Sequence, residues 1–426
     1  MKVAAGTFHH WLLAQEARAL LTRLDRVKPF VLYETMVPAA ALSRGAQASI
    51  EGYLASGRDN LRGMVHDYLH WLLGADGHAT TPEVAQRHFT LLRLRFNTVL
   101  TQFDLFSDAI TQRSEHDTGV WLAGLDALAQ DALELSGDYY PAPEVVCYLD
   151  RGVGAAIRRA RTRLPGGGEN PVAVIRVPRE RMIGSGIASS LVHEVGHQAA
   201  ALLDLVNSLC AELQQQVGDA WRYFERCISE IVADFWSVAR VGVTATLGLM
   251  GVVSLPRAFV FRMVLDDPHP FPWIRVKLSC AMGAALYPHR QWQRLARLWD
   301  AFYPTAGLNA AAHALIQELE DTIPEFVALL TQHRPNALHG RSLAEALDVD
   351  ARQPARLSAL FKTWHGASRR MRAAAPALVC AVVGQAKIDG KLSAEQESKL
   401  LARLLTQWAM RRALEVSAPR ATAFVY

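Results

Sequence analysis

The sequence is poor in cysteine and in net charge, and each shortage argues against a class of protein. Its 426 residues include five cysteines, scattered and without Cys-x-x-Cys spacing. This argues against a zinc–thiolate site and predicts reduced thiols in a cytoplasmic protein. The formal net charge is only +4, and no run of lysine and arginine is present, so no nucleic-acid partner is expected.

Long hydrophobic runs are also missing. The most apolar stretch, 241–255, is closed by Pro256 and is shorter than the ~18–20 residues that a membrane-spanning helix needs. The start, "MKVAAGTFHHWLLAQEAR", lacks the continuous apolar segment of a secretory signal. We therefore expect a soluble protein without stable membrane insertion, in which 241–255 forms a buried or groove-lining helix.

Helical periodicity dominates the chain, and strand patterns are confined to its middle. Two strands are predicted, at 145–149 and at "VAVIRVP", 172–178, with a basic helix between them at 154–164. A long helix is expected to follow from an N-cap at Ser185. The predicted fold class is α+β and predominantly helical, with a helical N-terminal region at 1–138, a middle domain at 139–345 and a C-terminal helical module at 346–426.

The middle domain contains His193-Glu194-Val195-Gly196-His197, an H-E-x-x-H pattern. Residues four apart lie about 40° apart around a helix, so His193 and His197 can direct one nitrogen each at a single ion. Neutral imidazole is a good zinc ligand, and Glu194 can reach a metal-bound water without being a ligand itself. A catalytic zinc site needs one more protein ligand.

That third ligand is sought downstream of the motif. A continuation with Gly at 200 and His at 203 is absent, because Ala200 and Leu203 stand there. Three glutamates remain, Glu212, Glu225 and Glu230, and of these only Glu230 is followed four residues later by an acid, Asp234. Glu230 and Asp234 also lie in a strongly apolar helical context, where carboxylates need partners. Glu230 is therefore the favoured ligand.

HExxH followed by ExxxD on the next long helix resembles the gluzincin zinc peptidases. The resemblance implies a zincin-like core, with one zinc per chain held by His193, His197 and Glu230. It further implies that Glu194 is the general base toward the zinc-bound water and that Asp234 holds a ligand histidine through its other ring nitrogen. In this family an edge strand binds extended substrate, and "VAVIRVP" occupies the corresponding place. The implied activity is peptide-bond hydrolysis by an endopeptidase.

Other features of the sequence carry weaker hypotheses. The proline-rich segment 266–275 is expected to present His269 and Arg275 from a fixed loop, as binders of the oxyanion or of a substrate carboxylate. His66 and His70, with Asp67 between them, are interpreted as ordinary helix packing. In the tail, Asp389-Gly390 predicts a turn and Ser393 with Gln396 a capping box.

Two functions remain open from the sequence. One is zinc-dependent hydrolysis of a polypeptide, with the C-terminal helical module as a surface for a protein partner. The other is a non-catalytic zinc-containing scaffold or partner-binding protein. The intact Glu194 favours the first, because a purely structural zinc site has no need of a base.

Overall fold

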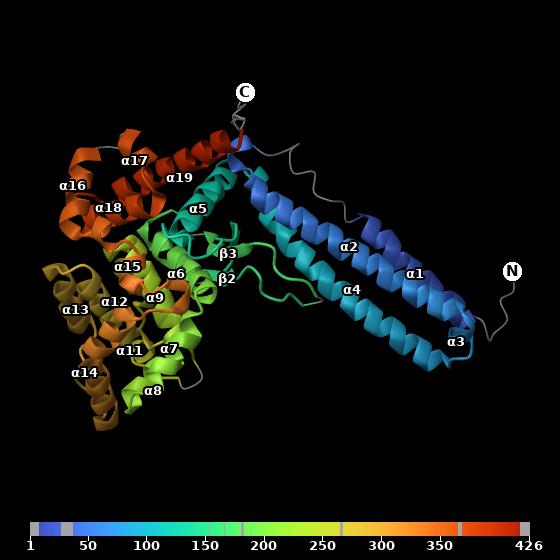
Figure 1. Ribbon diagram of the computed structural model, residues 1–426, viewed down its shortest axis with the longest axis horizontal. Coiled ribbons are helices and arrows are strands. Elements are labelled where there is room, and N and C mark those ends of the chain that lie inside the picture. Colours follow the sequence, from blue (N-terminus) through green and yellow to red (C-terminus); the bar gives the residue numbers. More distant parts are fainter. Residues whose placement is uncertain are drawn as a thin grey trace.

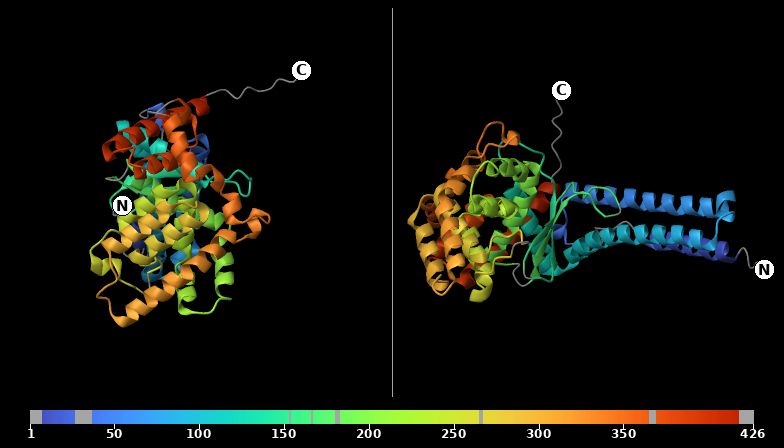
Figure 2. Two further views of the ribbon diagram at one scale, coloured as in Figure 1. Left: turned by 90° about the vertical axis from the view of Figure 1, so that its left-hand side faces the viewer. Right: turned by 90° about the horizontal axis from the view of Figure 1, so that it is seen from below.

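The computed structural model describes residues 8–26, 37–152, 154–165, 167–179, 183–264, 267–364 and 369–417. It is predominantly helical with one small sheet, in agreement with the predicted α+β class. A long helical arm projects from a larger helical body (Figure 1). The sheet lies between the two, which is clearest in the right-hand view of Figure 2.

The arm is built from three long helices and one short one: α1 (Phe8–Arg26), α2 (Arg44–Leu73), α3 (Ala75–His78) and α4 (Pro82–Thr111). The start of α2 is capped by Ser43, whose hydroxyl accepts from the Ala46 N–H, and α4 begins with Pro82 after the capping residue Thr81. At 1.5 Å per residue, α2 and α4 are about 45 Å long. The arm has a hydrophobic core of its own.

The sheet has three strands, β1 (Val145–Asp150), β2 (Ala156–Arg158) and β3 (Ala173–Pro178), in the order β1-β3-β2. β3 pairs with β1 in parallel and with β2 antiparallel. The expectation that 172–178 forms an edge strand is therefore wrong: β3 is central. Its nearly continuous apolar sequence is typical of a strand buried on both faces.

The two faces of the sheet belong to two different cores. Val146 and Val174 pack with the arm helices, whereas Cys147 and Ile175 pack with the body. Alternate residues of a strand point to opposite faces. The apolar residues of β1 and β3 therefore pack alternately against the arm and against the body.

The expected basic helix at 154–164 is also wrong, because β2 occupies its first half. Ile157 lies opposite Ile175 in the antiparallel register. After β2 the chain turns, with Arg161 at φ +62° and the Asn170 amide donating to the carbonyls of Arg158 and Arg159. Pairing with β3 overrides the local helical pattern of this segment.

Helices build the remainder of the body around one continuous hydrophobic core. The principal helices are α5 (His116–Leu133), α6 (Ser185–Leu202), α7 (Leu205–Leu213), α8 (Asp219–Arg226), α9 (Ile228–Val241), α10 (Val243–Val253), α12 (Pro272–Leu286), α13 (Arg290–Phe302), α14 (Ala310–Gln332), α16 (Pro354–Trp364), α18 (Pro376–Ile388) and α19 (Ala394–Ser417). Shorter pieces are η1 (Pro38–Ala40), η2 (Gln112–Ser114), α11 (Arg257–Val260), η4 (Asn336–Leu338), α15 (Leu343–Ala346), η5 (Val349–Arg352) and α17 (Arg369–Ala373).

The C-terminal helices share the core of the body. The Thr244 hydroxyl in α10 donates to the Cys380 carbonyl in α18, and the Ala377 N–H donates to Asp131 in α5. α5 itself packs against α19. Helices from the expected N-terminal region and C-terminal module thus cover the middle of the chain directly.

The apolar stretch 241–255 folds largely into α10, most of whose residues are buried. In the part of the chain that the structure describes, no helix combines the length and the apolar character needed to cross a membrane. All five cysteines are free thiols, as expected.

Candidate metal centre

The motif helix α6 and the helix α9 cross in close contact, and a glycine makes this possible. A Cβ atom built on Gly196 would lie 2.8 Å from the Cα of Ala233 and 2.9 Å from its carbonyl oxygen. No real side chain tolerates such contacts with backbone, so only glycine allows the two helices to approach this closely. The crossing brings the two motif histidines of α6 against the carboxylates of α9.

His193, His197 and Glu230 come together at this crossing. His193 Nε2 lies 3.2 Å from Glu230 Oε2, and His197 Nε2 lies 3.4 Å from Glu230 Oε1. The potential ligand atoms of the three residues all lie within 4.8 Å of one another. Ligands about 2.0–2.1 Å from a tetrahedral zinc are separated by about 3.3–3.4 Å. The two histidine–glutamate distances match this value, and the wider separations in the group, up to 4.8 Å, would contract on metal binding.

The carboxylate of Glu230 provides a second test of fit. Its Oε2 atom is buried and makes no hydrogen bond of good geometry among the described residues. Its neighbours include the ring nitrogens of His193 and His269, each 3.2 Å away, and a cation bound there would stabilise this buried carboxylate oxygen further. Two imidazole nitrogens and a carboxylate oxygen form one of the donor sets found in catalytic zinc sites, so the residues present fit a bound zinc ion.

Asp234 lies behind His193. Its Oδ1 atom is 2.8 Å from His193 Nδ1, the nitrogen that faces away from Glu230. On its other side, Asp234 accepts hydrogen bonds from Arg275 Nε at 2.6 Å and Nη2 at 2.9 Å. Burial raises the pKa of Asp234, but Arg275 and His193 outweigh it and hold this pKa well below its usual range. A permanently ionised Asp234 fixes the orientation of the His193 ring.

The two histidines have opposite electrostatic environments. Burial lowers the pKa of His193, but Asp234 and then Glu230 outweigh it and raise the pKa to about 9. For His197, burial and the neighbouring His193 lower the pKa to about 4. Its Nδ1 atom lies 3.5 Å from the Ser229 hydroxyl. The pKa of Glu230 is lowered, because the adjacent histidines outweigh its burial.

Glu194 lines a small cavity together with His193. The backbone N–H of Ile157 in β2 donates to its carboxylate, and burial nevertheless raises its pKa. The cavity has a volume of about 160 Å³. Its lining includes residues from four parts of the chain. They are the segment before β2 (Gly154, Ala155), the motif helix α6 (Ser190, His193, Glu194), α10 (Ala245, Leu249, Val252) and the loop residue His269. Glu194 thus faces the same cavity as His193 and is held there by the backbone of β2.

The structure separates the two residues expected on the proline-rich loop. His269 does lie on the loop, half exposed, with Nε2 3.2 Å from Glu230 Oε2 and Nδ1 2.7 Å from Asp267 Oδ1. Arg275 instead belongs to α12, which begins at Pro272, and its guanidinium is engaged by Asp234. The expectation of a loop-borne Arg275 is wrong, since the third proline of the segment starts a helix.

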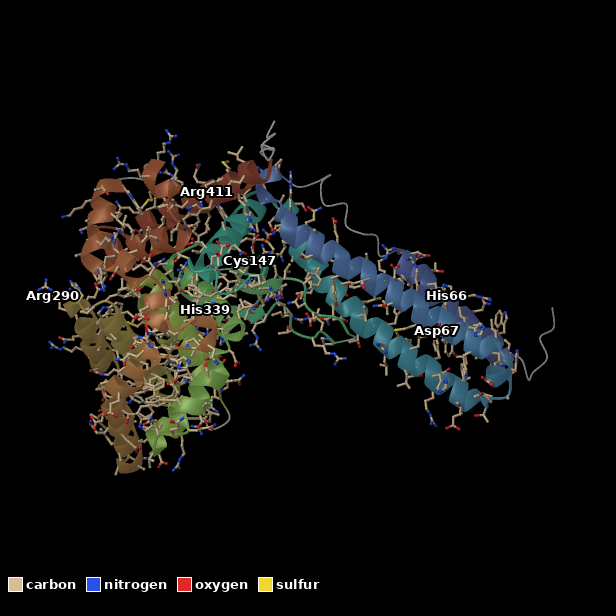
Figure 3. All side chains as sticks on the ribbon, viewed as in Figure 1. His66, Asp67, Cys147, Arg290, His339 and Arg411 are labelled. Carbon is tan, nitrogen blue, oxygen red and sulfur yellow. The ribbon has the colours of Figure 1, made fainter. Side chains whose placement is uncertain are left out.

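The remaining candidates lie elsewhere. Glu212 pairs with His333 Nδ1 at 2.7 Å, and Glu225 accepts from the Gln214 amide at 2.6 Å. α7 and α8 bridge the long interval between His197 and Glu230. His66 and Asp67 lie on the arm, on an exposed face of α2 (Figure 3).

Sequence reasoning missed three features of this centre: the close packing at Gly196, the Ile157 N–H and the Asp267 carboxylate. The HExxH motif tolerates any residue at position 196, so its spacing carries no sign of a required glycine. Asp267 stands two residues before His269, a spacing that only the loop conformation turns into a contact. Comparisons of the chain with protein-family models, with curated proteins and with solved structures gave no match.

Proposed function

We propose that the protein is a zinc-dependent peptidase with a zincin-like core. The observation that carries this proposal is the position of Glu194. It shares one cavity with His193, while His193, His197 and Glu230 converge from two packed helices. A site that only bound zinc for stability would need no partly buried carboxylate beside its ligands.

Each residue of the chain has a defined task in this proposal. His193, His197 and Glu230 would hold zinc, and Asp234 would orient His193. The ion, when bound, supplies Lewis-acid activation of water and of the scissile carbonyl. Glu194 accepts a proton from the attacking water and returns it to the leaving amine, a role that its raised pKa suits. His269 would stabilise, through its Nε2 atom, the negative charge that develops on the substrate.

The substrate is proposed to be a polypeptide bound along β2 in place of β3. Among the described residues β2 pairs only with β3, so its other edge has no strand partner beside the cavity, although the Ile157 N–H there donates to Glu194. The outer edge of β1 is covered, because Asp126 and Gln112 bond the N–H groups of Cys147 and Leu149. An extended peptide can add to the open edge through backbone hydrogen bonds. Five free thiols fit a cytoplasmic protein.

The direct test compares Glu194→Gln with wild type on a mixed peptide library. We expect the variant to keep its zinc and to lose about 10²–10⁴-fold in hydrolysis, because the general base is gone. Glu225→Gln is the matched control and should cleave at the wild-type rate. Equal cleavage by Glu194→Gln would refute the proposal, and a zinc-loaded wild type that cleaves no peptide would favour the scaffold function instead.

A further inference from the structure

A second cavity lies on the body, between α13 and the turn that joins α18 to α19. It has a volume of about 820 Å³, and its lining includes Arg290, Arg294 and Arg297 on one side and Ile388 and Lys391 on the other. We call it the α13 groove. Arg290 lies at the outer edge of the body, in the view of Figure 3 on the side opposite the arm.

The three arginines of the α13 groove have no carboxylate partner. All three are exposed, and within the described part of the chain none of them makes an ion pair. The one acid in the lining, Asp389, is already occupied, because it accepts from Lys391, Ser358 and Gln385. The groove therefore keeps an uncompensated positive charge.

The walls of the groove are firmly held. Gln291 and Gln385 bond to each other through their side-chain amides, which ties α13 to α18. Ser393 and Gln396 form the capping box that the sequence predicts, which fixes the turn at the start of α19. A concave surface with fixed walls and unpaired guanidinium groups can bind an anionic ligand with little rearrangement.

We propose that the α13 groove binds an acidic, extended segment of a protein partner. Arg290 and Arg294 are about 6 Å apart along the helix axis, and carboxylates on alternate residues of an extended chain are about 6.6 Å apart. Each guanidinium can form a bidentate pair with a carboxylate. Ile388 adds an apolar contact for a side chain between the acids.

The geometry favours a peptide over a nucleic acid. The groove offers three arginines, and the whole chain has a net charge of only +4. Nucleic-acid binding relies on many phosphate contacts spread over a broad basic surface. This proposal does not depend on the metal centre. The arginines belong to the expected middle domain, and the C-terminal helical module contributes only Ile388, Asp389 and Lys391 to the groove.

The test is fluorescence anisotropy with the full chain and a labelled peptide of alternating glutamate and serine. We expect R290Q/R294Q/R297Q to bind the peptide about tenfold more weakly than wild type, since each exposed ion pair contributes modestly. The matched control, R18Q/R26Q/R44Q, removes the same charge from the exposed surface of the arm and should bind as wild type. Binding should weaken with salt.

Several results would overturn the proposal. The first is an unchanged peptide affinity in R290Q/R294Q/R297Q. The second is an equal loss of affinity in both triple variants, because this would show an effect of net charge alone. The third is that a single-stranded oligonucleotide of equal charge binds more tightly than the peptide through the same arginines. This result would make a nucleic acid, and not a peptide, the partner. If the melting curve shows that the groove variant does not fold, the single variants Arg294→Gln and Lys391→Gln replace it. Their peptide affinities are then compared with that of wild type in the same way.

Discussion

Gly196 in α6 lies directly against Ala233 in α9, so closely that a Cβ at Gly196 would approach the Ala233 Cα to 2.8 Å. Gly196 stands between His193 and His197 in the sequence, and Ala233 follows Glu230 by three residues on α9. The backbone packing of the two helices therefore sets the distances between the candidate metal ligands.

Gly196→Ala should separate the two helices and disturb the metal centre with them. We expect a loss of about 1–3 kcal/mol in the free energy of unfolding, together with reduced zinc content. Gly251→Ala in α10 is the matched control, because a Cβ there meets no atom within 4 Å. It should be neutral or stabilising by up to about 1 kcal/mol. Melting curves and metal analysis measure both effects, and wild-type zinc content in Gly196→Ala would contradict this role.

The same helix crossing shows how much of the centre the sequence could predict. His193, His197, Glu230 and Asp234 follow helical spacing, so two helices and their polar faces were predictable. The position of β2 was not, because a three-residue strand is decided by its pairing with β3 rather than by its own pattern. Arg275 was misplaced for a related reason, since Pro272 starts a helix instead of extending a loop.

Asp234→Asn should weaken zinc affinity by about 10–100-fold, because His193 loses the carboxylate that orients it. The change also leaves Arg275 without its ionised partner, which lowers stability. Arg275→Gln separates the two effects: it should lower stability while keeping Asp234 against His193, and so cost less zinc affinity. A competitive chelator titration measures the affinities. Equal zinc affinity in Asp234→Asn and wild type would argue against a supporting carboxylate.

His269→Ala should reduce kcat by about 10²-fold while leaving zinc content and KM unchanged, since it removes a donor to the developing negative charge. Asp267→Asn should give a smaller loss of the same kind, because Asp267 only holds the ring. Steady-state kinetics on a cleaved library peptide distinguish these outcomes. Loss of zinc in His269→Ala would instead identify His269 as a ligand.

Zinc binding should release protons in a way set by the two histidine pKa values. At about pH 6, His193 is protonated because its pKa is raised to about 9, whereas His197 is neutral because its pKa is lowered to about 4. A ligand histidine must be neutral, so binding should release about one proton, and apparent affinity should rise with pH up to about 9. Calorimetry in buffers with different heats of ionisation counts the protons. Release of none, or of two, would contradict these assignments.

The central claim is that His193, His197 and Glu230 together hold a metal ion, and zinc analysis of matched variants tests it most directly. The protein purified without chelators should carry about one zinc per chain. Glu212→Ala removes a carboxylate that pairs with His333, so it should keep that zinc, whereas Glu230→Ala should lose it. Full zinc retention in Glu230→Ala, with loss in Glu212→Ala, would contradict the account.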